Sequence, residues 1–311
     1  MASPSSLFVS GAAGFLGRRV LGAALGAGYR VTAVIRACEQ ESARDLVDVP
    51  IVELDWDDEA ALADLLRVAS PTAIVHCAGH SGRFAGAPDV PELRNANVGL
   101  SSRLLKAVSR GCPEARVVLL SSAAVYGVSP PIPTREDAPL LPASEYGASK
   151  LITERVGRTF AERGVHTIIA RPFNVIGPGE PSGSVVTRLA VQALTVPRGG
   201  TAHVFLREVA SVRDFVDVDD VARALVLLSS RGAAGSAYNV CSGQGVSIGE
   251  LVDRASRVWQ RRIELSVEDP GTVATVSIGD PSALAALGWR PQRPLEETLG
   301  AIATSVAREV A

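Results

Sequence analysis

The stretch Leu7-Phe-Val-Ser-Gly-Ala-Ala-Gly-Phe-Leu-Gly17 joins a short apolar run to three glycines spaced as GxxGxxG. The apolar run predicts a buried strand, and residues 15–25 have the spacing of an amphipathic helix. Glycines at such a turn let the backbone approach a pyrophosphate, which the N–H groups at the helix start can bind. The same glycines would also suit close packing of helix on strand. Their place after the first strand favours a dinucleotide-binding fold.

The alternation of apolar runs with helical patterns continues to about residue 171. Uninterrupted runs of Val, Ile and Leu are typical of parallel strands that are covered on both faces. Strands are expected at residues 7–10, 30–35, 51–54, 73–76, 116–121 and 166–170, and helices at 15–25, 59–68, 92–110 and 145–163. This order predicts an α/β fold with a doubly wound parallel Rossmann sheet.

The rhythm of the chain changes after Arg171-Pro172, where Gly and Pro cluster in Gly177-Pro-Gly-Glu-Pro-Ser-Gly183 and the elements become shorter. We therefore expect a dinucleotide-binding domain at residues 1–171. Residues 172–311 are expected to form mainly a smaller, interleaved substrate-binding lobe, with some segments returning to the first domain.

The composition excludes several classes of protein. The 311 residues are 47% hydrophobic and carry a net charge of −2, so nothing indicates binding to nucleic acid or to a membrane surface. No apolar run is long enough for a membrane span, and no basic segment precedes the first strand as in a signal peptide. The four cysteines are scattered and predict reduced thiols in a cytoplasmic protein. They share no ligand spacing with the histidines, so no metal site is expected.

The end of the second expected strand bears on the choice of dinucleotide. A carboxylate there favours NAD, whereas Arg36 favours pairing with the 2′-phosphate of NADP, with Arg18 as a second cation. Arg36 could also be one solvated charge among many arginines. We predict NADP, supplied as NADPH, with NAD as the less favoured cofactor. Asp55 ends the third strand, where it would accept a hydrogen bond from the adenine amino group or cap the next helix.

Lysine is rare in this chain: of 31 basic residues, only Lys106 and Lys150 are lysines. Lys150 follows Tyr146 by four residues on an expected helix, so the two share one face. An ammonium beside a phenol stabilises the phenolate and lowers the phenol pKa, which makes it a better proton donor at neutral pH. Ser122 lies at the end of the fifth strand, where doubly wound sheets bind ligands. We expect Ser122 and Tyr146 to meet over one substrate oxygen.

These motifs together resemble the extended short-chain dehydrogenase/reductase family. The likeness continues in Val75-His-Cys-Ala-Gly79, Asn97-Val-Gly-Leu-Ser101, Arg171-Pro-Phe-Asn-Val-Ile-Gly-Pro-Gly179, Ser211-Val-Arg-Asp-Phe215 and Tyr238-Asn-Val-Cys-Ser-Gly243. The later segments resemble the branch that acts on nucleotide sugars, above all the GDP-4-keto-6-deoxymannose reductases and related nucleoside-diphosphate (NDP) hexose 4-ketoreductases.

The resemblance implies four catalytic residues. Ser122 would bind the sugar carbonyl oxygen, and Tyr146 would protonate it as hydride arrives from the nicotinamide. Lys150 would lower the pKa of Tyr146 and bind the nicotinamide ribose. Asn97 would anchor a water molecule of a proton relay.

The resemblance also implies contacts with both ligands. Cofactor contacts are implied for Gly11, Ala13, Gly14, Phe15, Leu16, Gly17, Arg36, Asp55, Trp56, Cys77, Ala78, Gly79, Ser121, Tyr146, Lys150 and Pro172. Substrate contacts are implied for His80, Ser81, Ser122, Tyr146, Asn174 and Arg213, the last two at the diphosphate.

Other polar residues are better explained by structural roles. Arg171 is expected to form a buried ion pair at a strand end, and Tyr126 to pack without transferring protons. Acidic residues close to a helix start are expected to act as caps: Asp214, Asp217, Asp219 and Asp220.

The predicted function is NADPH-dependent reduction of an NDP-4-keto-6-deoxyhexose in deoxysugar biosynthesis, for an antibiotic or a surface glycan. The alternatives are an NDP-sugar 4-epimerase with tightly bound NAD and a non-catalytic dinucleotide sensor. Ala123 and Ala124 replace the acids that dehydratases of this branch carry after the catalytic hydroxyl, which disfavours dehydration. Ala274 falls where the family often has a second diphosphate-binding arginine, which leaves the substrate pose and the nucleotide open. The sequence also does not give the nucleobase, the sugar configuration or the keto position. A homodimer joined by helices 92–110 and 145–163 is expected.

Overall fold

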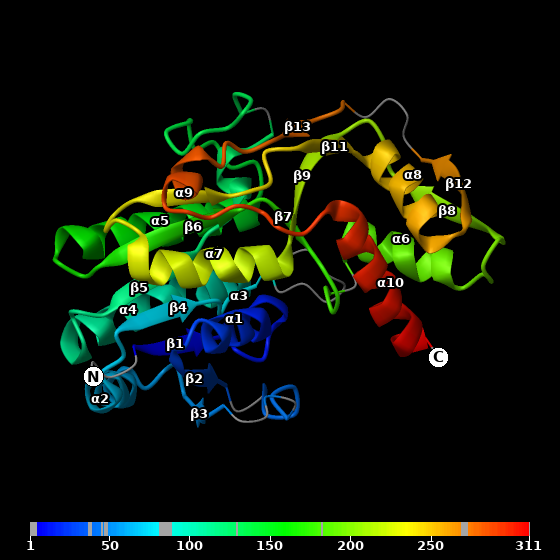
Figure 1. The fold of residues 1–311 in the computed structure, drawn as a ribbon. Coiled ribbons are helices and arrows are strands. Elements are labelled where there is room, and N and C mark those ends of the chain that lie inside the picture. Colours follow the sequence, from blue (N-terminus) through cyan, green and yellow to red (C-terminus); the bar gives the residue numbers. More distant parts are fainter. Residues whose placement is uncertain are drawn as a thin grey trace.

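A computed structural model describes residues 5–36, 39–44, 46, 49–80, 89–128, 130–181, 183–268 and 273–310. Its centre is a seven-stranded sheet in which every neighbouring pair is parallel (Figure 1). In spatial order the strands are β10 (Ala237–Val240), β6 (Thr167–Pro172), β5 (Arg116–Leu120), β4 (Ala73–His76), β1 (Ser6–Ser10), β2 (Arg30–Ile35) and β3 (Ile51–Glu53). The chain order reverses between β1 and β4, as in a Rossmann sheet. The predicted fold class is confirmed.

Helices cover both faces of this sheet (Figure 1). On one face α1 (Phe15–Gly26) and α7 (Val218–Arg231) pack together over a core of small aliphatic side chains. On the other face lie α2 (Glu59–Ala69), α4 (Leu100–Gly111) and α5 (Glu145–Glu162). In the part of the chain that the structure describes, no helix is long and apolar enough to cross a membrane.

The helix expected at residues 92–110 is not regular. It consists of α3 (Val90–Arg94), a π-helical turn (Asn95–Gly99) and α4. Two hydroxyl groups reach the carbonyl oxygen of Asn97, that of Ser101 at 2.7 Å and that of Thr153 at 3.3 Å. Side chains that bond to helix carbonyls in this way compete with the regular ladder, which accounts for the local irregularity.

A second group of elements, at the right of Figure 1, has its own hydrophobic core. It contains α6 (Val185–Leu194), α8 (Ile248–Trp259), α10 (Leu295–Val310) and the parallel pair β8 (Thr201–Leu206) and β12 (Arg262–Val267). A further sheet lies between the two cores. It comprises β7 (Asn174–Ile176), β9 (Val212–Asp217), β11 (Gly245–Ser247) and β13 (Val276–Ser277), while α9 (Ser282–Ala286) contacts β10.

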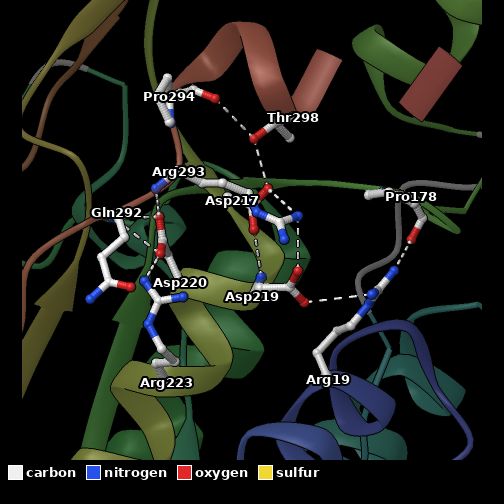
Figure 2. Close-up of polar contacts among 10 residues, drawn as sticks. All are labelled: Arg19, Pro178, Asp217, Asp219, Asp220, Arg223, Gln292, Arg293, Pro294 and Thr298. Atoms are coloured by element: carbon white, nitrogen blue, oxygen red, sulfur yellow. Dashed lines mark hydrogen bonds and ion pairs between the residues drawn. The ribbon is translucent and has the colours of Figure 1, made fainter. Parts of the chain in front are cut away.

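Polar contacts around the start of α7 join the two groups (Figure 2). Asp217 caps the helix by accepting from the Asp219 N–H at 2.7 Å, and it also accepts from the Thr298 hydroxyl of α10 at 2.7 Å. Asp219 pairs with Arg293 at 3.0 Å and with Arg19 of α1 at 3.5 Å. Asp220 does not cap the helix, because its carboxylate accepts from the backbone N–H groups of residues 292 and 293.

Asp214 departs from its predicted role as a helix cap. It lies inside β9 and is fully buried. Its carboxylate accepts from the hydroxyl and N–H of Ser242 at 2.6 and 2.8 Å, and from the N–H groups of Gly243 and Gly279 at 2.9 and 3.2 Å. The carboxylate therefore holds the loops at residues 242–243 and 279 against β9. No local sequence pattern indicates this role.

A buried ion pair lies behind the ends of β5 and β6. Arg171 of β6 donates to both carboxylate oxygens of Glu154 on α5, at 2.8 and 2.7 Å, and the two side chains are 0% and 1% exposed. Ser121, which follows β5, donates to the same carboxylate at 2.6 Å. Arg171 also donates to the Tyr126 hydroxyl at 2.8 Å. Arg171 is thus the buried pair expected from the sequence.

We predict that Glu154→Ala lowers the free energy of unfolding by about 3–5 kcal/mol, because it leaves the Arg171 guanidinium buried without a counter-charge. The matched control is Glu250→Ala, which removes the ion pair between Glu250 and Arg254. Because the Glu250 side chain is 47% exposed, this change should lower the free energy of unfolding by less than about 1 kcal/mol. Urea unfolding followed by circular dichroism measures both. Equal losses in the two variants would contradict the assignment.

Candidate active site

A cavity of about 670 Å³ opens at the carboxyl edge of the central sheet. Many residues singled out from the sequence line it: Gly11, Gly14, Phe15, Leu16, Gly17, Cys77, Gly79, His80, Ser121, Ser122, Tyr146, Lys150, Pro172, Asn174 and Arg213. Segments far apart in the chain meet here because parallel strands end at one edge. Ser81 lies outside the described residues.

The glycine turn forms a tight cradle at one end of the cavity. A Cβ on Gly17 would lie 2.1 Å from the Gly11 carbonyl oxygen, and one on Gly11 would lie 2.7 Å from the Ala78 nitrogen. Gly11 also has a φ of +66°, which favours glycine. Helix α1 begins here with no side-chain cap and no acid in its first turn. Its N–H groups and positive dipole end therefore suit an anion, and the cradle fits the pyrophosphate of a dinucleotide.

Lys150 is buried at the centre of the site. Its ammonium donates to the Leu120 carbonyl at 2.9 Å and lies 5.9 Å from the centre of the Tyr146 ring. Burial lowers the pKa of Lys150 from 10.5 to about 8, an effect that Cys77 partly opposes. A Cβ on Gly79 would lie 3.5 Å from the ammonium. A guanidinium is broader, so the narrow site favours lysine over arginine.

Ser122 and Tyr146 are positioned by two neighbouring helix starts. Ser122 precedes a short 3₁₀ helix (Ala123–Tyr126), and its hydroxyl accepts from the Ala124 N–H at 3.2 Å. Tyr146 lies in the first turn of α5, where the Ser144 hydroxyl caps the helix by accepting from the Gly147 N–H at 3.1 Å. The two helix starts bring both hydroxyl side chains to the same cavity.

Asn97 links the loop after β4 to helix α5. Its side-chain oxygen accepts from the His80 N–H at 2.9 Å, and its amide donates to the His80 carbonyl at 3.0 Å and to Ser149 at 2.9 Å. Asn97 is 1% exposed. These contacts fix the backbone of His80 at the cavity wall, and the proton relay implied for Asn97 stays a prediction.

Several side chains expected at the cofactor have other contacts in this structure. Ser121 is committed to Glu154, and Asp55 accepts from the Asp57 N–H at 2.9 Å. Trp56 is buried, with its ring 5.7 Å from that of His76. Their contacts with a cofactor stay predictions, as do those of Ala13 and Ala78, which are not among the cavity-lining residues.

The opposite wall comes from the sheet between the two cores and from the second group of elements. Asn174 donates to the Asp214 carbonyl at 3.1 Å, and Arg213 is held by the carbonyl and hydroxyl oxygens of Thr275 at 2.8 and 2.7 Å. Two further cationic residues of this wall, Arg188 and Arg207, were missed from the sequence. Arg207 follows the strictly alternating strand β8, so its position at a strand end was the available signal.

Comparison with known proteins agrees with this geometry. Residues 7–241 match the NAD dependent epimerase/dehydratase family. The chain belongs to this family. The resemblance to extended short-chain dehydrogenases/reductases is thereby confirmed, and with it the prediction of an NAD(P)-dependent oxidoreductase.

Relatives within the family carry different activities. A UDP-glucose 4-epimerase from Azospirillum brasilense is 34% identical, over 94% of this chain and 88% of that protein. A GDP-6-deoxy-D-mannose reductase from Pseudomonas aeruginosa is 30% identical over 95% of both chains. The solved structure of RMD from Pseudomonas aeruginosa complexed with NADPH superimposes with a TM-score of 0.83 at 27% identity, covering 98% of both chains. Family membership alone therefore leaves the net reaction open.

The low pKa of Lys150 has a consequence for stability. Between pH 8 and 10.5 the unfolded chain holds a proton that the folded chain has released, so stability from this group rises with pH. Below pH 8 the folded state bears the full cost of a buried charge. We predict that Lys150→Met is more stable than wild type at pH 7 by about 2 kcal/mol, and that the difference shrinks towards pH 10.

Urea unfolding without dinucleotide at several pH values measures this difference. Lys106→Met is the matched control, because it makes the same change at a lysine whose side chain is 46% exposed. A Lys150→Met variant that is less stable than wild type at pH 7 would show that the ammonium is better solvated than its burial indicates.

Proposed function

We propose that this protein reduces an NDP-4-keto-6-deoxyhexose with NADPH. The observation that carries the proposal is the convergence of Ser122, Tyr146 and Lys150 on one cavity with the glycine cradle. Asn174 and Arg213 on the opposite wall are proposed to bind the sugar diphosphate. The three described cysteines are unpaired thiols, which supports a cytoplasmic location.

NADPH, when bound, supplies the hydride that reduces the carbonyl carbon. Tyr146 donates its phenolic proton to the carbonyl oxygen, and Ser122 donates a hydrogen bond to the same oxygen. Negative charge develops on this oxygen as the hydride arrives, so a preplaced pair of donors stabilises the transition state more than the ground state. The Lys150 ammonium stabilises the phenolate that remains, and a proton from solvent then restores Tyr146.

The Pseudomonas reductase, with its similarity over nearly the whole chain, supports reduction as the net reaction. Arg36 at the end of β2 supports NADPH. Dehydration is not supported, because Ala123 and Ala124 beside Ser122 carry no group that can move a proton. A sensor without catalysis would have no need of Ser122, Tyr146 and Lys150.

The second candidate is an NDP-sugar 4-epimerase, which the Azospirillum relative favours. An epimerase returns the hydride to the sugar, so it retains its dinucleotide and consumes none. The two functions are separated by assaying dTDP-, GDP- and UDP-4-keto-6-deoxyhexoses by NADPH absorbance, with products identified by NMR. Sugar conversion by the purified protein without added NADPH would instead establish the epimerase.

Replacement of the phenol tests the mechanism. We expect Tyr146→Phe to lower turnover by about 10²–10⁴-fold, the usual contribution of a positioned proton donor, while NADPH binding changes little. Tyr29→Phe is the control, since Tyr29 lies outside the cavity. Full turnover by a Tyr146→Phe protein that binds NADPH normally would remove Tyr146 from the mechanism.

We also propose that the protein is a homodimer joined by α4 and α5. Ile152 on α5 is a large apolar side chain that is 38% exposed, and it would be buried in such a contact. Light scattering is expected to give twice the chain mass for wild type and the chain mass for Ile152→Asp. A monomeric wild type at assay concentration would exclude this interface.

A further inference from the structure

Directly after β2, Arg36 and Glu39 form an ion pair. Arg36 donates to one carboxylate oxygen of Glu39 from Nη2 at 2.8 Å and from Nε at 3.2 Å. The other carboxylate oxygen accepts from the backbone N–H of Arg36 at 2.9 Å. The Glu39 side chain is 23% exposed, whereas Arg44 and Glu41 of the same segment touch once, at 3.8 Å, and are 77% and 88% exposed. Glu39 is therefore fixed in place.

This pair lies close to the glycine cradle. Strands β1 and β2 are parallel with Ser10 opposite Val34, so the end of β2 lies beside the residues that lead into Gly11. Arg18 in α1 donates to the Ala13 carbonyl at 2.9 Å and also to the Ser42 carbonyl, which ties the segment containing Glu39 to the cradle. The positive charge of Arg36 contributes, after burial, to the lowered pKa of His80 at the cavity wall.

The chemistry of the pair bears on the adenosine ribose. In a Rossmann fold the end of the second strand lies at the ribose 2′ position, where a carboxylate accepts from a hydroxyl and a guanidinium pairs with a phosphate. This chain has both groups there. Glu39 occupies two donors of Arg36 and holds a negative charge against the guanidinium that would pair with a 2′-phosphate. Like charges repel, and the repulsion is larger near a protein surface than in bulk water.

We propose that Glu39 is a second determinant of dinucleotide choice, which weakens binding of NADPH, supports binding of NADH and so lets this chain use both. The proposal rests on the dinucleotide-dependent function proposed above. Arg36 supplies the preference for a 2′-phosphate, and Glu39 limits how large that preference becomes. An ion pair on the surface with no part in binding would explain the same contacts, and the test separates the two.

The test measures the dissociation constants of NADPH and NADH for the full-length protein, from the fluorescence of the reduced nicotinamide. Glu39→Gln keeps the shape and an amide oxygen but removes the charge. We expect the NADPH constant to fall by about fivefold and the NADH constant to rise by about threefold, as for the loss of one partly exposed charge contact. Arg36→Leu should move the ratio in the opposite direction. Glu41→Gln, the same charge change two residues away, should leave it within about twofold of wild type.

The outcomes distinguish this proposal from the proposed function. The proposal is overturned if wild type binds both dinucleotides and the ratio of the NADPH and NADH dissociation constants is the same in Glu39→Gln as in Glu41→Gln. Glu39 then has no part in the choice of dinucleotide. If wild type binds neither dinucleotide, the proposed function fails first. A shift towards NADPH in Glu39→Gln, with no change in the control, supports the proposal.

Discussion

The ion pair between Arg171 and Glu154 brings together the elements that supply the site. Glu154 follows Lys150 by one helical turn, Ser121 precedes Ser122, and Arg171 precedes Pro172. One buried carboxylate thus joins α5 to the ends of β5 and β6. Apolar residues of similar volume often replace such a pair without loss of stability, but apolar contacts do not fix the orientation of the neighbouring residues. Hydrogen bonds from two strand ends to one carboxylate fix how the strands present the adjoining residues to the cavity.

Gly79, Asn97 and Lys150 are packed closely at the cavity, and the burial of Lys150 in this packing lowers the stability of the folded state. A Cβ on Gly79 would lie 2.6 Å from the Asn97 side-chain oxygen and 3.5 Å from the Lys150 ammonium, so a glycine is required where the loop passes between them. The ammonium itself is held where burial lowers its pKa to about 8. Because burial disfavours the charged ammonium, Lys150 destabilises the folded state at neutral pH, where it carries a proton. Burial also keeps the positive charge close to Tyr146 and poorly screened by water, which suits the proton transfer proposed for Tyr146.

The sequence predicted those features that depend on neighbours along the chain. The glycine cradle, the six expected strands and the Tyr146–Lys150 spacing are local patterns, and each has a matching element. Strand β10 was not predicted, because its partner β6 is about 70 residues earlier and its four residues carry no distinctive strand pattern, although residues 238–240 belong to a segment that resembles the family. At the π-helical turn, one of the two hydroxyls that reach the Asn97 carbonyl is that of Thr153, from another helix. Asp214 acts through loops at residues 242–243 and 279, which the sequence does not place together.

The Arg36–Glu39 pair shows why the sequence predicts the residues of the site better than it predicts the choice of dinucleotide. Both residues were visible in the sequence, but a cation three residues before an acid in an arginine-rich chain is usually a solvated contact. Only the fold shows that the carboxylate is also fixed by the Arg36 N–H beside the cradle. The distinction matters because the two candidate functions, reductase and epimerase, would use the same Ser122, Tyr146 and Lys150 and would differ in whether the dinucleotide leaves after each turnover. An enzyme that consumes NADPH gains nothing from holding the oxidised product tightly. If Arg36 binds a 2′-phosphate as proposed, its sharing of donors with Glu39 would weaken that contact and would favour exchange of NADP over its retention.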